Sequence, residues 1–126
     1  MLDTSAAIHL RDGDLEVRRR VDGLDGPVVL SVLTRVELEG GVDRSDPTRR
    51  ALRRARLDVI LAAFQTLPLE PSVADRYRTI VEGAGYSRRK VVDRVIAAHA
   101  LDLQATLVTM NPDDVKDVQG LKVLAL

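Results

Sequence analysis

Short apolar segments alternate with longer segments of helical periodicity along the whole chain, and this alternation restricts the fold more than any other feature. The β-like segments are residues 1–3, 28–30, 66–69, 106–109 and 122–126. The helical segments are residues 5–11, 15–24, 32–39, 46–64, 71–82 and 90–103. Short apolar strands separated by helices are typical of a largely parallel sheet covered by helices on its faces. The pattern therefore predicts an α/β fold.

Capping and helix-breaking residues support several of these boundaries. Ser31 is placed to cap the helix that follows it, and Pro47 stands in the first turn of the next helix. The pair Gly40 and Gly41 predicts the end of the helix that begins after Ser31. Asn111, followed by a proline and two acidic residues, predicts another helix start.

Composition narrows the classes of protein that this chain can belong to. With 126 residues, of which 45% are apolar, it has the size and apolar content of one ordinary domain, residues 1–126. No cysteine is present, which excludes disulfide scaffolds, thiolate zinc sites and cysteine nucleophiles. We expect no membrane span or signal peptide and hence a cytoplasmic protein. The formal net charge is zero, although sixteen arginines lie partly in clusters.

Four acidic residues stand near the ends of β-like segments or on the apolar side of a predicted helix: Asp3, Glu37, Asp93 and Asp114. In a parallel sheet, functional sites form at the carboxyl ends of the strands. Carboxylates in such places are costly unless a positive group holds them. Because oxygen ligands suit Mg²⁺ or Mn²⁺, the four residues predict a site for one or two such ions.

Each of these acids also has a purely structural explanation. Asp3 can cap the helix after it, and Glu37 can be a surface residue. Asp93 can form an ion pair with Arg94 or another arginine. Asp114 can complement the dipole at a helix start. The two histidines are not spaced as a zinc pair, and His99 is expected to be a core residue with a satisfied hydrogen bond.

Four stretches in this order resemble the PIN-domain ribonucleases, in particular the VapC-type toxins of toxin–antitoxin pairs. They are residues 2–8 (LDTSAAI), 31–40 (SVLTRVELEG), 93–100 (DRVIAAHA) and 107–115 (LVTMNPDDV), the last followed by GLKV at 120–123. Each stretch is weakly specific, whereas the ordered set is fairly specific and extends over residues 1–126. The resemblance implies a three-layer α/β/α fold with a mostly parallel, twisted sheet of about four to five short strands.

The resemblance also implies roles for individual residues. Asp3, Glu37 and Asp93 match the family's core metal ligands, and Asp114 matches its fourth acid, with Asp113 as the alternative. Polar residues that would orient carboxylates or water are Thr4, Ser5, Thr34 and Asn111.

The implied activity is that of a Mg²⁺- or Mn²⁺-dependent endoribonuclease, usually dimeric and inhibited by a cognate antitoxin protein. For contacts with the RNA substrate we expect Arg88, Arg89 and Lys90, which precede the helix of Asp93. An acidic, amphipathic antitoxin tail would suit the Arg-rich helical segments between residues 15 and 64. The alternative is a catalytically inactive module of the same fold that binds RNA or protein.

Overall fold

The computed structural model describes all residues from 1 to 126. The α-helices are α1 (Thr4–Arg11), α2 (Leu15–Asp22), α3 (Val32–Asp43), α4 (Pro47–Ala63), α5 (Pro71–Ala84) and α6 (Val91–Asp102). Two 3₁₀ turns are η1 (Arg88–Lys90) and η2 (Pro112–Val115). The strands are β1 (Val29–Ser31), β2 (Gln65–Leu67), β3 (Leu107–Thr109) and β4 (Val123–Ala125). No helix is both long and apolar enough to cross a membrane.

The sheet is parallel and is joined at its centre by a single residue. β1 pairs with β2, and β3 pairs with β4, so that two small parallel sheets form. Leu2 makes parallel bridges to both Leu30 and Val108. The amide of Leu2 donates to the carbonyl of Val29 (3.0 Å), and the amide of Val108 donates to the carbonyl of Met1 (2.8 Å). The chain start therefore lies between β1 and β3 and connects them.

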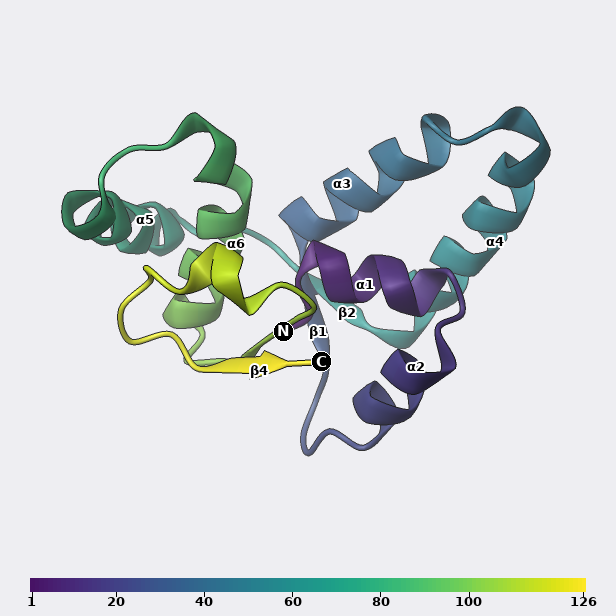
Figure 1. Cartoon of the computed structure of the whole chain (residues 1–126), viewed down its shortest axis with the longest axis horizontal. Helices are drawn as coiled ribbons and strands as arrows, with labels where there is room; N and C mark the ends of the chain where they lie inside the picture. Colours follow the sequence, from purple (N-terminus) through teal and green to yellow (C-terminus); the bar gives the residue numbers. More distant parts are fainter.

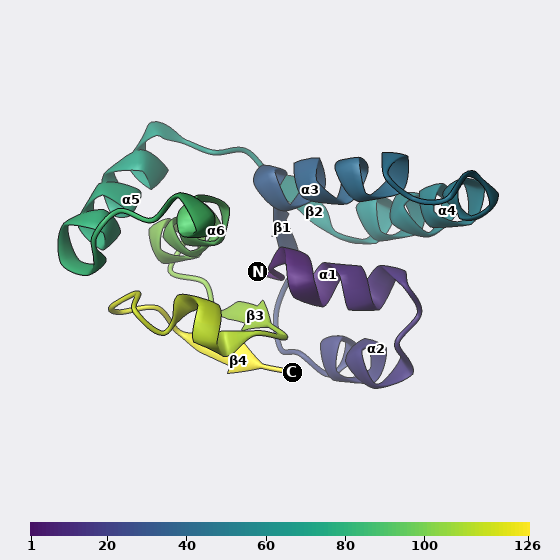
Figure 2. The ribbon, with the colours of Figure 1, turned by 45° about the horizontal axis from the view of Figure 1, so that its top comes forward.

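Two cores lie on opposite faces of this sheet. Leu2, Leu30 and Val108 pack with α1, α2, α3 and α4 in one core. Their neighbours Met1 and Leu107 pack with α5, α6 and η2 in the other. Successive residues of a strand point to opposite faces, which explains the division. Figures 1 and 2 show α1–α4 on one side of the strands and α5–α6 on the other. The predicted three-layer α/β/α architecture is confirmed.

Side-chain caps begin α3 and α4, and the cap at Ser31 and the first-turn position of Pro47 are as predicted. The hydroxyl of Ser31 accepts from the amide of Leu33 (3.2 Å) at the start of α3. The carboxylate of Asp46 caps α4, and Pro47 is its first residue. These local signals succeed because they satisfy amides that the helix itself leaves free.

The predicted end of α3 at Gly40 and Gly41 is wrong, since the helix continues to Asp43. Val42 is only 5% exposed and belongs to the same core as Leu38, one turn earlier. Burial of Val42 outweighs the helix-breaking tendency of two glycines, which is about 1 kcal/mol each. Tertiary packing therefore decides where this helix ends.

Other boundaries also differ from the prediction, and α2 ends at Asp22 rather than at residue 24. Asn111 makes no side-chain cap, and a 3₁₀ turn rather than an α-helix follows it. The segment predicted as one helix over residues 90–103 begins as η1 and becomes α-helical only at Val91. α5 extends past Glu82 to Ala84 and ends at Gly85, whose φ of 81° suits glycine.

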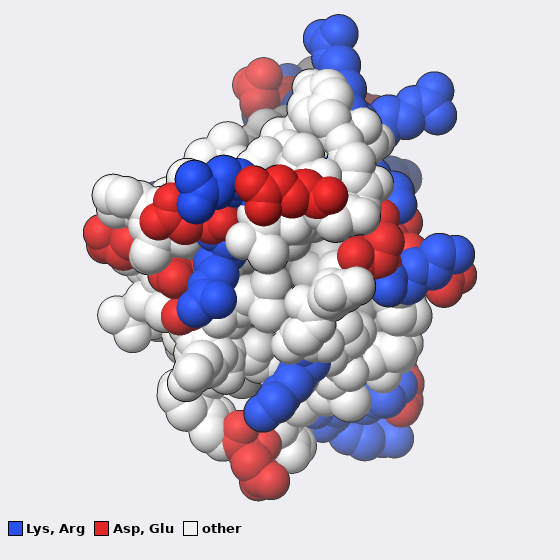
Figure 3. All heavy atoms as spheres, turned by 90° about the vertical axis from the view of Figure 1, so that its left-hand side faces the viewer, with Lys and Arg blue, Asp and Glu red and all other residues white.

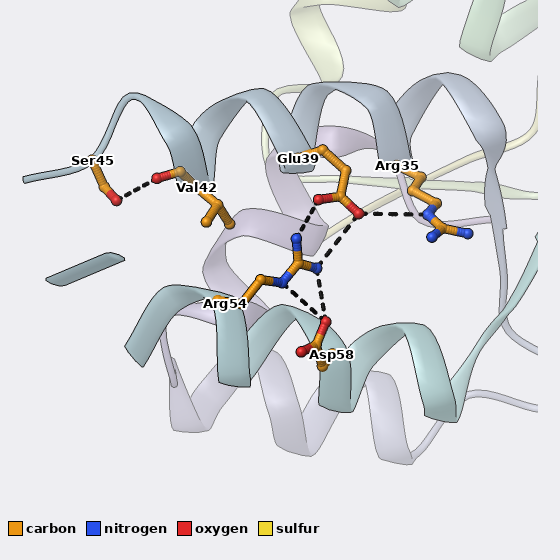
Figure 4. A network of polar contacts seen from close by, with 6 residues as sticks. All are labelled: Arg35, Glu39, Val42, Ser45, Arg54 and Asp58. Carbon is orange, nitrogen blue, oxygen red and sulfur yellow. Dashed lines mark hydrogen bonds and ion pairs between the residues drawn. The ribbon is translucent and has the colours of Figure 1, made fainter. Parts of the chain in front are cut away.

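An ionic network joins α3 to α4 (Figure 4). Arg54 lies between Glu39 of α3 and Asp58 of its own helix, and Arg35 approaches Glu39 from one turn away at 3.7 Å. The hydrogen bond from Arg54 lowers the pKa of Glu39. Near the network, Ser45 donates to the carbonyl of Val42 and closes the turn between the helices.

His99 is a core residue, as predicted. It is 2% exposed, and its Nδ1 lies 2.9 Å from the hydroxyl of Ser31. Burial lowers the pKa of His99, because the charged imidazolium loses its hydration there.

We therefore expect stability to fall as the pH is lowered below about 6.5, the ordinary histidine value, because only the unfolded chain then protonates His99 freely. One such group contributes a slope of up to about 1.4 kcal/mol per pH unit. Urea unfolding at pH 5 to 7.5 measures it. The variant His99→Asn should show a shallower slope, and parallel curves for the two proteins would contradict this prediction.

Candidate active site

Asp3 begins α1 directly after the residue that joins the sheet. Its amide donates to the carbonyl of Val108 (2.9 Å). Its Oδ1 accepts from the amide of Ala6 (2.9 Å) and from the hydroxyl of Ser5 (2.7 Å), whereas no hydrogen bond reaches Oδ2. The capping role foreseen for Asp3 is thus present. It leaves the second oxygen free at the carboxyl edge of the sheet.

Ser5 links Asp3 to the end of β3. Its hydroxyl lies 3.3 Å from the hydroxyl of Thr109 and accepts from the amide of Met110 (3.0 Å). Thr109 in turn accepts from the amide of Asn111 (3.0 Å). The polar residues Ser5 and Asn111, predicted from the sequence, therefore belong to a hydrogen-bonded connection around Asp3.

Glu37 faces the start of α1 from α3. It is half-buried, and its carboxylate accepts a hydrogen bond from the hydroxyl of Thr4. The hydroxyl of Thr4 also lies 3.5 Å from that of Thr34, which is fully buried. Two predicted polar residues thus hold Glu37 at the same edge as Asp3.

Asp93 is the residue on which the other acids converge. It is half-buried in the first turn of α6 and makes no hydrogen bond or ion pair. Burial raises its pKa most, and the charges of Asp114, Glu37 and Asp3 raise it further. Lys90 acts in the opposite direction as the weakest of these influences. The structure therefore brings three predicted acids near the fourth, Asp93, which lacks a paired cation.

The ion pair foreseen between Asp93 and Arg94 does not form. Arg94 is 2% exposed and instead donates to Asp117 (2.8 Å) and to the carbonyl of Gly85 (2.6 Å). Lys90 binds the same oxygen of Asp117 at 3.1 Å. Since the nearest arginine is engaged elsewhere, the acidic cluster keeps its negative charge.

Asp113 and Asp114 are both exposed on η2, which packs against α6. Only Asp114 is among the charges that raise the pKa of Asp93. This favours Asp114 over Asp113 as the fourth acid.

These donors fit a hard divalent cation in their chemistry, since all four are carboxylates and the polar groups nearby orient two of them. In the arrangement present here, no three acidic or histidine side chains already form a metal-ligand set. Binding an ion would therefore require the side chains to rotate toward a common centre.

The residues expected to contact RNA lie on η1, beside the start of α6. Arg88 and Arg89 are exposed and make no ion pair, whereas Lys90 is held by Asp117. On the face that the α5 side presents, basic and acidic side chains are interspersed (Figure 3). A positive surface is therefore local rather than continuous there.

Sequence reasoning missed Thr109 and Asp117. Thr109 is 1% exposed and connects Ser5 with Asn111, and a polar residue at the end of an apolar strand was the available signal. Asp117 had no such signal, because its partners Lys90 and Arg94 are more than twenty residues away in the chain.

Comparison with known proteins assigns the family. The protein-family model of the PIN domain matches residues 1–121 of the sequence. The chain belongs to the PIN-domain family. Along its full length this PIN domain is 29% identical to "Ribonuclease VapC1" of Rickettsia felis, of which it covers 95%. The resemblance predicted from the sequence motifs is thereby confirmed.

Solved structures have the same fold. VapBC2 of Rickettsia felis, solved with a promoter DNA fragment, matches with a TM-score of 0.86 and 23% identity over 100% of this PIN domain and 97% of that chain. A member of the VapBC family of toxin–antitoxin systems, VapBC-5 of Mycobacterium tuberculosis, matches with a TM-score of 0.66 and 26% identity over 79% of this chain and 82% of that one.

Replacing the charge of Asp93 should stabilise the metal-free PIN domain. A carboxylate with a raised pKa destabilises the folded state above that pKa, and this cost disappears as the pH falls toward 3.8. In chelator at pH 7, Asp93→Asn should therefore have a higher midpoint of thermal unfolding than the wild type. The difference should shrink as the pH is lowered. The matched control Asp113→Asn, on the exposed side of η2, should not show this gain; an unchanged or lower midpoint for Asp93→Asn would contradict the prediction.

Removing the charge of Asp117 should destabilise the fold, because it leaves the buried guanidinium of Arg94 without a counter-charge. We expect Asp117→Asn to cost about 2–3 kcal/mol of unfolding free energy, measured by chemical denaturation. The control is Asp22→Asn, which removes an exposed pair with Arg18 and should cost less than about 1 kcal/mol. Equal losses in the two variants would contradict the structural role of Asp117.

Proposed function

We propose that this PIN domain is a metal-dependent endoribonuclease that acts as the toxin of a toxin–antitoxin pair. The observation that supports this most is the convergence of Asp3, Glu37 and Asp114 on Asp93, a half-buried carboxylate without a paired cation. A full-length relative that is named a ribonuclease points the same way.

The residues of the candidate site would have separate roles in catalysis. Asp3, Glu37, Asp93 and Asp114 would hold Mg²⁺ or Mn²⁺. Thr4 keeps the carboxylate of Glu37 in place through its hydrogen bond. The hydroxyl of Ser5 donates to Asp3 and accepts from the amide of Met110 after β3. These hydrogen bonds keep Asp3 at the sheet edge and leave Oδ2 of Asp3 free.

A divalent ion held there would supply positive charge for a phosphodiester beside the acids and would activate water for hydrolysis. Arg88 and Arg89, which are exposed on η1, are available to bind phosphates of the RNA on the α6 side. Lys90 is shared with Asp117 and contributes mainly to the local positive field.

One observation favours a second candidate function. Because no three acidic side chains are preassembled as a ligand set, a catalytically inactive PIN module that binds RNA or protein is the alternative. It predicts RNA or protein binding without metal-dependent cleavage. An RNA cleavage assay with and without metal separates the two functions.

The partner that we propose is a cognate antitoxin protein. The matched solved structures are of VapBC proteins, and one of them names a toxin–antitoxin family. Exposed apolar side chains on α2 and α4, namely Leu15, Leu52 and Val59, give a partner apolar surface on the Arg-rich helices. A homodimer of the toxin is part of the same proposal.

Cleavage of total RNA by the purified protein tests the nuclease. We expect fragments with Mg²⁺ or Mn²⁺ and none with chelator. Asp93→Asn should lose activity by roughly 100-fold or more while remaining folded, because the ligand set loses its central charge. Gel electrophoresis of the RNA and circular dichroism of the variants provide the two readouts.

Neighbouring acids on η2 provide a matched pair for this assay. Asp114→Asn should reduce cleavage strongly, whereas Asp113→Asn should retain most of it, since only Asp114 acts on Asp93. Full activity of Asp93→Asn would refute the nuclease.

A further inference from the structure

A pocket beside the acidic cluster, among α1, α3 and α4, has charged lining residues that are mainly basic. It has a volume of about 480 Å³. Its lining includes Thr4 and Glu37, which also belong to the candidate active site, together with Arg11, Arg44 and Arg53. Figures 1 and 2 show these three helices together, away from α5 and α6. The pocket thus continues directly from the acidic edge of the sheet.

Arg11 is the deepest cation of this pocket. Only 5% of the residue is exposed, and its Nε donates to Asp12 at 3.0 Å. Neither of its terminal nitrogens makes a hydrogen bond or an ion pair. A Cβ at Gly41 would lie 3.3 Å from Nη1 of Arg11, so glycine leaves the guanidinium its room. Only Nε of Arg94 and Oδ1 of Asp117 are fully buried without a partner, so the terminal nitrogens of Arg11 reach solvent at the pocket and are available to an acceptor from outside the chain.

Arg44 and Arg53 also keep their charges free, for neither makes a side-chain hydrogen bond or an ion pair. The contrast is with Arg54, the next residue of α4, which Glu39 and Asp58 neutralise (Figure 4). Glu37 is the only acid that lines the pocket. The site therefore has an excess of positive charge although the whole chain has none.

Basic groups continue beyond Arg53 along α4. A second pocket of about 360 Å³ shares Arg53 and is also lined by Arg49 and Arg56, with Asp12 as its only acid. Arg56 donates to a backbone carbonyl, that of Asp12, and has no ion pair. The two pockets form a positive path that starts at Glu37 and follows α4.

We propose that the pocket formed by Arg11, Arg44 and Arg53 binds a backbone phosphate of single-stranded RNA next to the phosphate at the acidic cluster. This inference rests on the proposed nuclease function and adds a substrate subsite to it. Every nucleotide carries a phosphate, so a strand that has one phosphate over the acids must place a neighbouring one nearby. Guanidinium groups bind phosphate oxygens through paired hydrogen bonds. Because such contacts read no base, the subsite contributes affinity and position rather than sequence preference.

Binding of a fluorescein-labelled single-stranded RNA of mixed sequence tests the subsite, measured by fluorescence anisotropy at several salt concentrations. The full chain carries Asp93→Asn, and chelator is present, so that cleavage does not interfere. The variants are Arg44→Gln, Arg53→Gln and their combination, because the buried Arg11 is less safely replaced. Arg78→Gln on α5, an exposed side chain with one long ion pair of 4.0 Å, is the matched control.

The combined variant should bind RNA roughly tenfold more weakly, and equally so for RNAs of different sequence. The slope of log affinity against log salt should fall by about 0.7 for each phosphate that the variant no longer neutralises. With Asp93 intact and metal present, its KM for RNA cleavage should rise while kcat changes little. Arg78→Gln should alter none of these quantities.

Equal RNA affinities and salt slopes for the combined variant and Arg78→Gln would overturn the inference. Unchanged RNA binding together with weaker binding of a polyglutamate peptide would overturn it too, and would assign the pocket to an acidic protein partner. Failure of the proposed nuclease function gives a different result from failure of the phosphate subsite. A wild type that cleaves no RNA refutes the nuclease, while weakened RNA binding in the combined variant still supports the phosphate subsite.

Discussion

The parallel bridges of Leu2 to Leu30 and Val108 are the interaction on which the rest of the structure depends. They join two small sheets that otherwise share no strand, and they place one fully buried leucine between the two halves of the sheet. Because main-chain hydrogen bonds set their direction, the residue after Leu2 emerges at the carboxyl edge. Asp3 therefore lies between the helix that follows β1 and the turn that follows β3, which carry Glu37 and Asp114.

Gathering four carboxylates at one edge has an electrostatic cost. No cation is paired with Asp93, and Lys90 is the weakest of the groups that act on it. Arg94, adjacent to Asp93 in sequence, turns away to Asp117 and to a backbone carbonyl. Burial raises the pKa of Asp93 most, and the charges of Asp114, Glu37 and Asp3 raise it further. A bound cation would offset this electrostatic cost, whereas a purely structural role would leave it without compensation. On the other side of Glu37, Arg11, Arg44 and Arg53 have the complementary surplus of positive charge.

Local signals in the sequence predicted the elements better than their ends. The cap at Ser31 and the proline at residue 47 operate within a few residues, and both helices begin where these signals indicate. The ends failed where distant residues intervene. α3 passes through two glycines because Val42 is buried against residues from other helices.

From the sequence alone, the alternation of strands and helices determined the α/β class, and the spacing of Asp3, Glu37, Asp93 and Asp114 indicated the acidic site. Both depend on order along the chain, which periodicity and motifs record. Only the tertiary structure decided which charges remain unpaired. It paired Arg54 with Glu39 and Arg94 with Asp117, and it left Arg44 and Arg53 without an ion pair beside Glu37. The reason is physical: an ion pair depends on distances of a few ångströms between side chains, and these are set by packing rather than by sequence separation.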